Sequence, residues 1–127
     1  MNEELLIKMT DGSIHTIEPV DVQPGTEMTD WRLFQVRLSN GSRTRHLVGR
    51  ADDEGRVCSS LVHLDLQALR MRTQSGRIYE LAGPPGSDED SDYVFGLWLR
   101  AVGAIHCKDL TRSLMRLRTL REPRRRS

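Results

Sequence analysis

The sequence contains no run of apolar residues long enough to cross a membrane. A transmembrane helix needs about 20 predominantly apolar residues, and the apolar runs here are only a few residues long. The chain begins Met-Asn-Glu-Glu, whereas a secretory signal begins with positive charge followed by an apolar stretch. The two cysteines, Cys58 and Cys107, lie far apart and do not suggest a disulfide framework. We therefore expect a cytoplasmic protein with reduced thiols and no membrane contact.

Signatures of catalysis and cofactor binding are also lacking. There is no G-x-G-x-x-G or Walker loop, and the glycines at 83 and 86 enclose two prolines, which have no N–H to donate to a phosphate. The Ser-Ser pair at 59–60 lies in a predicted strand and not in a G-x-S-x-G elbow. We therefore predict no catalytic residues and no cofactor. An enzyme with an unrecognised site stays an alternative, to be tested by alanine replacement of His63, His106 and Cys107.

Zinc ligands do not occur at the usual spacing. Structural zinc sites use knuckles such as C-x₂₋₄-C or H-x₃₋₅-H, whereas His106 and Cys107 are adjacent. Cys58 and His63 are five residues apart on a predicted strand, so they would face opposite sides. We predict buried thiols and surface histidines and no metal site.

The acidic run at 88–92 begins like a calcium loop. However, Tyr93 and Leu99 replace the glycine and the glutamate that an EF-hand requires at its sixth and twelfth positions. Carboxylates are favourable near the positive end of a helix dipole. We therefore assign the run to the first turn of a helix.

What the sequence does contain is a series of short strands separated by turn signals. Asp11-Gly12, Asn40-Gly41, the 52–55 segment and Gly76 each predict a turn. Alternation such as Phe34, Val36 and Leu38 is typical of a half-buried strand. The prolines at 19 and 24 predict a loop over 19–30. Seven strands are expected, at residues 5–9, 13–17, 31–38, 43–48, 56–64, 69–73 and 77–81.

The last third of the chain predicts helices. Apolar residues at helical spacing indicate an amphipathic helix over about 90–104, which would cover the sheet. Phe95 and Leu99 lie at about 200° and 240° from Tyr93 around this helix, so a single sheet would leave them partly exposed. Either a second helix or another molecule would then cover them. That second, shorter helix is expected after Asp109, which is placed to cap it.

These elements predict an α+β fold. We expect a strongly bent antiparallel sheet of about seven strands, or a partly closed barrel, packed by one C-terminal amphipathic helix. A single domain over residues 1–107 would be followed by an extension over 108–127, which holds the short second helix and an Arg-rich tail.

Basic residues are almost all arginine and are unevenly distributed. Lys8 and Lys108 are the only lysines among 19 basic residues. A GC-rich genome would explain this, and so would bidentate recognition of phosphate or carboxylate. Residues 108–127 carry a net charge of +6 and the other 107 residues carry −5. The basic segment contains no aromatic residue for base stacking.

We predict that a partner binds through the helices and the basic extension, and the alternative is a solvated tail that only maintains solubility. The candidate residues are Phe95, Leu99, Arg112, Arg116, Arg121, Arg124, Arg125 and Arg126.

Two stretches resemble a pattern in small uncharacterised proteins of proteobacterial plasmids, integrative elements and phages. One runs from Ser75-Gly76-Arg77-Ile78-Tyr79-Glu80-Leu81 through Gly83-Pro84-Pro85-Gly86 to Tyr93-Val94, and the other contains His46-Leu47-Val48-Gly49 and residues 55–60. The similarity covers about residues 43–100, and Cys58 stands where serine is expected. The resemblance implies an accessory protein of a mobile element and supplies no catalytic residues.

The function we expect is therefore a non-enzymatic binding protein that acts stoichiometrically on a protein partner. An inhibitor of a host defence complex, such as a CRISPR effector, fits this description. The alternative is a nucleic-acid-binding regulator that uses the Arg-rich C-terminus. A homodimer is left open.

Overall fold

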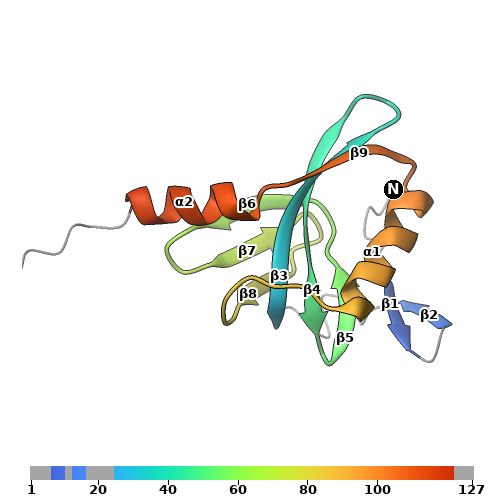
Figure 1. Cartoon of the computed structure of the whole chain (residues 1–127), viewed down its shortest axis with the longest axis horizontal. Helices are drawn as coiled ribbons and strands as arrows, with labels where there is room; N and C mark the ends of the chain where they lie inside the picture. Colours follow the sequence, from blue (N-terminus) through green and yellow to red (C-terminus); the bar gives the residue numbers. More distant parts are fainter. Residues whose placement is uncertain (1–6, 11–12, 17–24, 122–127) are drawn as a thin grey trace, which may run out of the picture.

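The chain forms an α+β fold, seen in a computed structural model that describes residues 7–10, 13–16 and 25–121 (Figure 1). This confirms the predicted fold class. The elements in chain order are β1 (Ile7–Thr10), β2 (Ser13–Thr16), β3 (Gly25–Leu38), β4 (Arg43–Ala51), β5 (Glu54–Val57), β6 (Leu61–Asp65), β7 (Arg70–Thr73), β8 (Ile78–Leu81), α1 (Glu89–Ala101), β9 (Ala104–Asp109) and α2 (Thr111–Arg121).

The strands form one open sheet. Its order is β2-β1-β5-β4-β3-β8-β7-β6, and β9 pairs with β3 beside this path. The pairing of β3 with β8 is parallel and the others are antiparallel. β2 and β6 lie at opposite ends of the path and no pairing among the described residues joins them, so the sheet is not closed into a barrel.

β3 connects the two halves of the sheet. One side of β3 pairs with β4, and the other side pairs first with β8 and then with β9. Between Thr29 and Arg32 the register with β4 shifts, and Asp30 has a φ of 48°. Such a bulge bends a strand and increases its twist. The prediction of a loop over 19–30 is therefore wrong for residues 25–30, which lie in β3, and residues 19–24 lie outside the described part.

Two apolar clusters fill the two faces of the bent sheet. The first lies between β3, β4, the β6–β8 strands and α2, and its buried members are Met28, Trp31, Leu33, Leu47, Cys58, Met71, Tyr79, Leu81 and Leu114. The second lies under α1 and comprises Phe34, Val36, Val48, Val57, Val94, Phe95 and Trp98. Figure 1 shows α1 on one side of the sheet and the β6–β8 strands with α2 on the other.

The buried face of α1 differs from the predicted one. Val94, Phe95 and Trp98 are buried, whereas Tyr93 is 58% exposed. The ring of Phe95 lies 4.5 Å from that of Phe34 and 6.2 Å from that of Trp98, measured between centroids. The prediction that Phe95 is exposed for a partner is therefore wrong, because β3 itself covers this side of the helix. Leu99 is half-buried and packs against the same cluster.

The acidic run begins α1, as predicted. Asp88 is the N-cap, and its side chain accepts a hydrogen bond of 2.8 Å from the Ser91 N–H. Glu89, Asp90 and Asp92 lie in the first turn, where carboxylates interact favourably with the helix dipole. Asp92 forms an ion pair with Arg32 of β3, so the run also fastens the helix to the sheet.

β9 was not predicted, and it crosses the boundary expected between residues 107 and 108. α1 ends at Ala101, and Gly103 adopts a φ of 70° that turns the chain toward β3. Pairs such as Gln35 with Lys108 then add β9 to the sheet. The predicted strand over 56–64 is also divided, into β5 and β6, so the described residues form nine strands and not seven.

Candidate partner-binding face

Four cationic side chains, one histidine and one amide form two rows across β4, β3 and β9. In the first row Arg37 pairs with Arg43 on one side and with His106 on the other. In the second row Gln35 lies between Arg45 and Lys108. Side chains two residues apart on a strand share a face, so the two rows lie next to each other. We call these six residues the cationic rows.

The rows occupy the sheet face opposite α1. Phe34 and Val36 point into the cluster under α1, so the alternating Gln35 and Arg37 point the other way. The four cationic residues of the rows and His106 are all exposed. Four members of the rows line a hollow of about 330 Å³, namely Gln35, Arg37, Arg43 and His106.

No carboxylate among the described residues pairs with the rows. Four other sheet arginines do have acidic partners, for example Arg50 at 3.3 Å from Asp90 and Arg56 at 2.8 Å from Asp52. Arg72 of β7 forms no ion pair with a described carboxylate, but it does not lie opposite another arginine. Like charges directly opposite each other across two strands are destabilising. The pairing of Arg37 with Arg43 therefore costs stability, and no ion pair with a carboxylate of the described residues offsets it.

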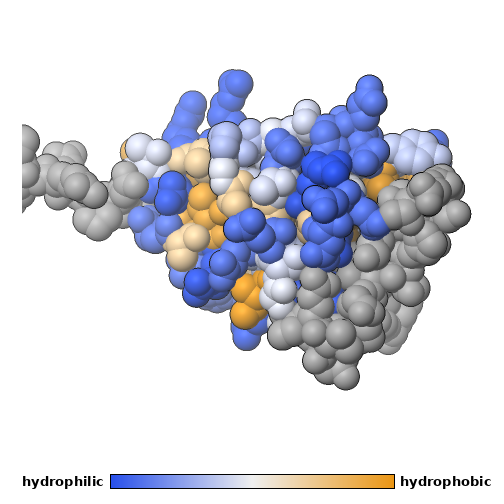
Figure 2. Space-filling model, turned by 90° about the horizontal axis from the view of Figure 1, so that it is seen from below, coloured by the Kyte–Doolittle hydropathy of each residue, from blue (hydrophilic) through white to orange (hydrophobic). Residues whose placement is uncertain are grey.

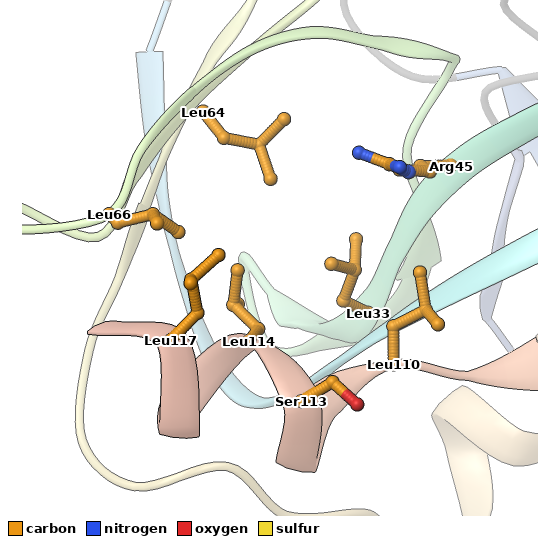
Figure 3. A pocket seen from close by; sticks show the side chains of 8 residues that line it. All are labelled: Leu33, Arg45, Leu64, Leu66, Leu110, Ser113, Leu114 and Leu117. Carbon is orange, nitrogen blue, oxygen red and sulfur yellow. The ribbon is translucent and has the colours of Figure 1, made fainter. Parts of the chain in front are cut away.

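An apolar groove adjoins the rows between β6 and α2. It has a volume of about 370 Å³ and is lined by Leu33, Leu64, Leu66, Leu110, Leu114 and Leu117, together with Ser113 and Arg45. Figure 3 shows the leucines converging from the β6 region, β3 and α2, with Arg45 at the opposite side. Arg45 belongs to both features, so the groove and the rows form one continuous face.

The groove opens onto an apolar surface. Leu117 is 40% exposed and Leu120, one turn further along α2, is 74% exposed. Figure 2 shows apolar surface on the α2 side of the molecule with hydrophilic surface around it. Apolar patches rimmed by polar residues are typical of interaction sites.

α2 is held in place, so the groove exists without a ligand. The Thr111 hydroxyl accepts a hydrogen bond of 2.9 Å from the Leu33 N–H, and the Asp109 side chain accepts one of 2.8 Å from the Thr111 N–H at the start of α2. Arg118 donates to the carbonyl oxygens of Leu66 and Gln67 at 2.9 and 3.0 Å. These contacts join both ends of the groove to the domain.

The structure describes the side chains of only some of the predicted basic residues. Arg112 and Arg116 are exposed on α2 and form no hydrogen bond or ion pair with another described residue. Arg121 ends α2, and its side chain is outside the described part. The tail arginines at 124, 125 and 126 lie outside the described residues altogether.

Sequence reasoning missed the cationic rows, although it predicted the two strands that carry four of their six residues. Residues 31–38 and 43–48 were predicted as strands joined through Asn40-Gly41. The hairpin at Asn40-Gly41 was predicted, but its register was not: a two-residue loop at 40–41 would place Arg37 opposite Thr44, whereas the structure pairs Arg37 with Arg43. The contribution of β9 was not predicted, because that strand pairs with a segment about 70 residues earlier.

The residues considered for zinc and catalysis do not come together. Cys58 is buried and its thiol donates to the Ser59 carbonyl oxygen at 3.0 Å, whereas Cys107 is exposed on β9. His63 is exposed on β6. Within residues 7–10, 13–16 and 25–121, no group of three or more His, Cys, Asp or Glu side chains is arranged to hold a metal ion.

Among His46, His63 and His106, whose side chains the structure describes, only His46 is buried. His46 is 3% exposed, and burial lowers its pKa from 6.5 to about 4, so its ring is neutral at pH 7. Nδ1 donates to the Cys58 carbonyl oxygen at 2.9 Å, and Nε2 therefore accepts from the Thr44 hydroxyl at 2.6 Å. The ring also contacts Trp98 at 4.4 Å between centroids. Both nitrogens are used, so His46 has none left for a substrate.

Neither helix in the described part of the chain combines the length and the apolar character needed to span a bilayer. Comparison with known proteins found no match among family models, curated proteins or solved structures.

Proposed function

We propose that this protein is a non-enzymatic binding protein that acts stoichiometrically on a protein partner through the cationic rows and the apolar groove. The observation that carries the proposal is the pairing of Arg37 with Arg43 across β3 and β4, with no carboxylate beside it among the described residues. Local rules of stability are broken in natural proteins mainly at functional sites. A partner that brings carboxylates to this face would turn the repulsion into attraction.

A protein surface suits this face better than a nucleic acid. The groove lining is mostly leucine, which would bury apolar side chains of a partner, and apolar burial is the main favourable term in protein association. Neither hollow is lined by Phe, Tyr or Trp, the large aromatic side chains on which bases stack best. The partner we propose therefore presents acidic residues beside apolar ones.

The resemblance to proteins of plasmids, integrative elements and phages supports host machinery as the source of the partner. A mobile element gains from a small protein that occupies a surface of host machinery in the cytoplasm. We propose an inhibitor of this kind, with a host defence complex such as a CRISPR effector as the first partner to test.

The test is capture of the partner from a host lysate with the tagged full-length chain and with two double variants. Arg43→Glu with Arg45→Glu reverses the rows, and Arg72→Glu with Arg100→Glu reverses two exposed arginines elsewhere. We expect the row variant to lose a protein that the unmodified chain and the control variant both capture in a constant ratio. Equal capture by both variants, or capture of nothing by the unmodified chain, would refute the proposal.

A second candidate function is binding of nucleic acid through α2 and the tail. Arg112 and Arg116 support it, because both are exposed and form no contact with a carboxylate of the described chain. Phosphate contacts make such binding weaken steeply with salt. Binding to duplex DNA is measured at low and high salt, with and without residues 121–127, and absence of binding by the full chain at low salt removes this candidate.

A further inference from the structure

β9 is an edge strand along its whole length. It pairs with β3 on one side, and no other described strand pairs with it. Residues 105–109 are all exposed, including Ile105 at 58%. Figure 1 shows β9 running alongside β3 from the end of α1 to the start of α2. An edge of this kind presents a row of backbone N–H and C=O groups to which a further strand can bind.

The side chains of β9 and of the strands behind it favour a negatively charged strand at this edge. His106 and Lys108 continue the two cationic rows, so they are followed inward by Arg37 and Gln35 and then by Arg43 and Arg45 on β4. Neighbouring strands are about 4.8 Å apart. Both rows thus lie within about 15 Å of a strand added beside β9, and the nearest charges lie within a Debye length of about 8 Å.

We propose that an extended, acidic segment of the protein partner binds to β9 as an additional strand. The proposal rests on the proposed function and names its mode of binding. Main-chain hydrogen bonds to β9 supply affinity, and alternate carboxylates opposite His106 and Lys108 supply selectivity, as in other cases of strand addition. Such a segment would also pass close to Arg45, which leads from the rows to the apolar groove.

Charge repulsion also disfavours two other binding partners at the β9 edge. Two copies of this chain joined edge to edge through β9 would bring two sets of cationic rows side by side, and like charges on neighbouring strands repel. A basic segment is disfavoured for the same reason. Lysine on an edge strand is a known protection against self-association, and here it leaves the edge open only to acidic strands.

The probe for this proposal is a ten-residue peptide in which Glu alternates with Thr, tested on the full-length protein. A peptide that alternates Lys with Thr is the charge control. Two further Glu-Thr peptides carry backbone N-methyl groups either on every Glu or on every Thr. Successive residues of a strand direct their N–H groups to opposite edges, so only one of these two isomers loses the donors that face β9.

We expect the Glu-Thr peptide to bind about tenfold or more tightly than the Lys-Thr peptide, and one N-methylated isomer to bind about tenfold more weakly than the other. Amide hydrogen exchange of residues 104–109 should slow on binding. Equal affinity of the two isomers, unchanged exchange in β9, or no binding of the Glu-Thr peptide would overturn the proposal. A dimer that forms through β9 without peptide would overturn it as well.

Variants of the protein add a second test. His106→Glu with Lys108→Glu should weaken the Glu-Thr peptide by about tenfold and strengthen the Lys-Thr peptide, whereas the α2 variant Arg112→Glu with Arg116→Glu should change neither. Should the β9 variant not fold, the N-methylated peptides still test the unmodified protein. If the Glu-Thr peptide fails to displace a partner whose capture depends on Arg43 and Arg45, strand addition is refuted while the proposed function stands.

Discussion

Acidification should destabilise this protein through one buried side chain, His46. Burial lowers the pKa of His46 to about 4 in the folded chain, whereas an unfolded histidine has a pKa of about 6.5. Between these two values the unfolded chain binds a proton that the folded chain does not bind. The free energy of unfolding therefore falls as the pH falls from 6.5 toward 4, and the contribution of a neutral His46 is fully present only above pH 6.5.

The size of the effect follows from the difference between the two pKa values. Each pKa unit corresponds to about 1.4 kcal/mol, so the full loss below pH 4 is about 3 kcal/mol, and about 2 kcal/mol is already lost at pH 5. A small domain has only about 5–15 kcal/mol of stability. His46 alone should thus remove a substantial part of it in mild acid.

The assay is urea unfolding at pH 7.5 and pH 5, with the unmodified chain, His46→Gln and His63→Gln. Glutamine can keep a donor for the Cys58 carbonyl oxygen but does not titrate, so His46→Gln should be less stable at pH 7.5 and should lose about 2 kcal/mol less on acidification. His63→Gln is the matched control, because it removes an exposed imidazole from β6. If the unmodified chain and His46→Gln lose the same stability between the two pH values, the reasoning is refuted.

Three further predictions concern packing and charge. Arg43→Glu should raise the free energy of unfolding by about 1 kcal/mol, because it replaces a repulsive cross-strand pair by an attractive one, and denaturant titrations should find the gain smaller at high salt. Gly55→Ala should lower the melting temperature, because a Cβ there would lie 2.7 Å from the backbone of Asp90 at the start of α1, whereas Gly96→Ala, which has open space around it inside α1, should raise stability by about 1 kcal/mol. Leu114→Ala should cost about 2–5 kcal/mol in urea unfolding, since this side chain of α2 belongs to the first apolar cluster; a loss near zero would mean that α2 is not packed against the sheet.

The sequence by itself determined the features that depend on near neighbours in the chain. Asn40-Gly41 and Gly76 were predicted as turns, and both glycines have the positive φ that those turns need. The acidic run was predicted as the first turn of a helix, and Asp88 caps that helix. In such cases the deciding contacts lie within a few residues, so local chemistry is sufficient.

The buried face of α1 was decided only by the tertiary structure. Apolar residues surround much of this helix, so the pattern allowed several overlapping faces. The sheet selected the arc that contains Val94, Phe95 and Trp98 and left Tyr93 exposed, because Phe34 and Val36 lie under that arc. Which arc is buried depends on the shape of the surface beneath, and the helix sequence carries no information about that surface.

The sequence determined one part of the candidate face, and the tertiary structure determined the rest. Two of the three residues in each cationic row come from the β3–β4 hairpin, which the sequence predicts through Asn40-Gly41, although only the structure shows which residues of the two strands lie opposite each other. The third residue of each row comes from β9, whose alternation of Ile105 and Cys107 with His106 and Lys108 is too short to predict a strand by itself. Its pairing partner, β3, lies about 70 residues earlier in the chain. Tertiary pairing therefore assembled the face on which the proposed function depends, because it set the register of β3 with β4 and brought His106 and Lys108 beside β3.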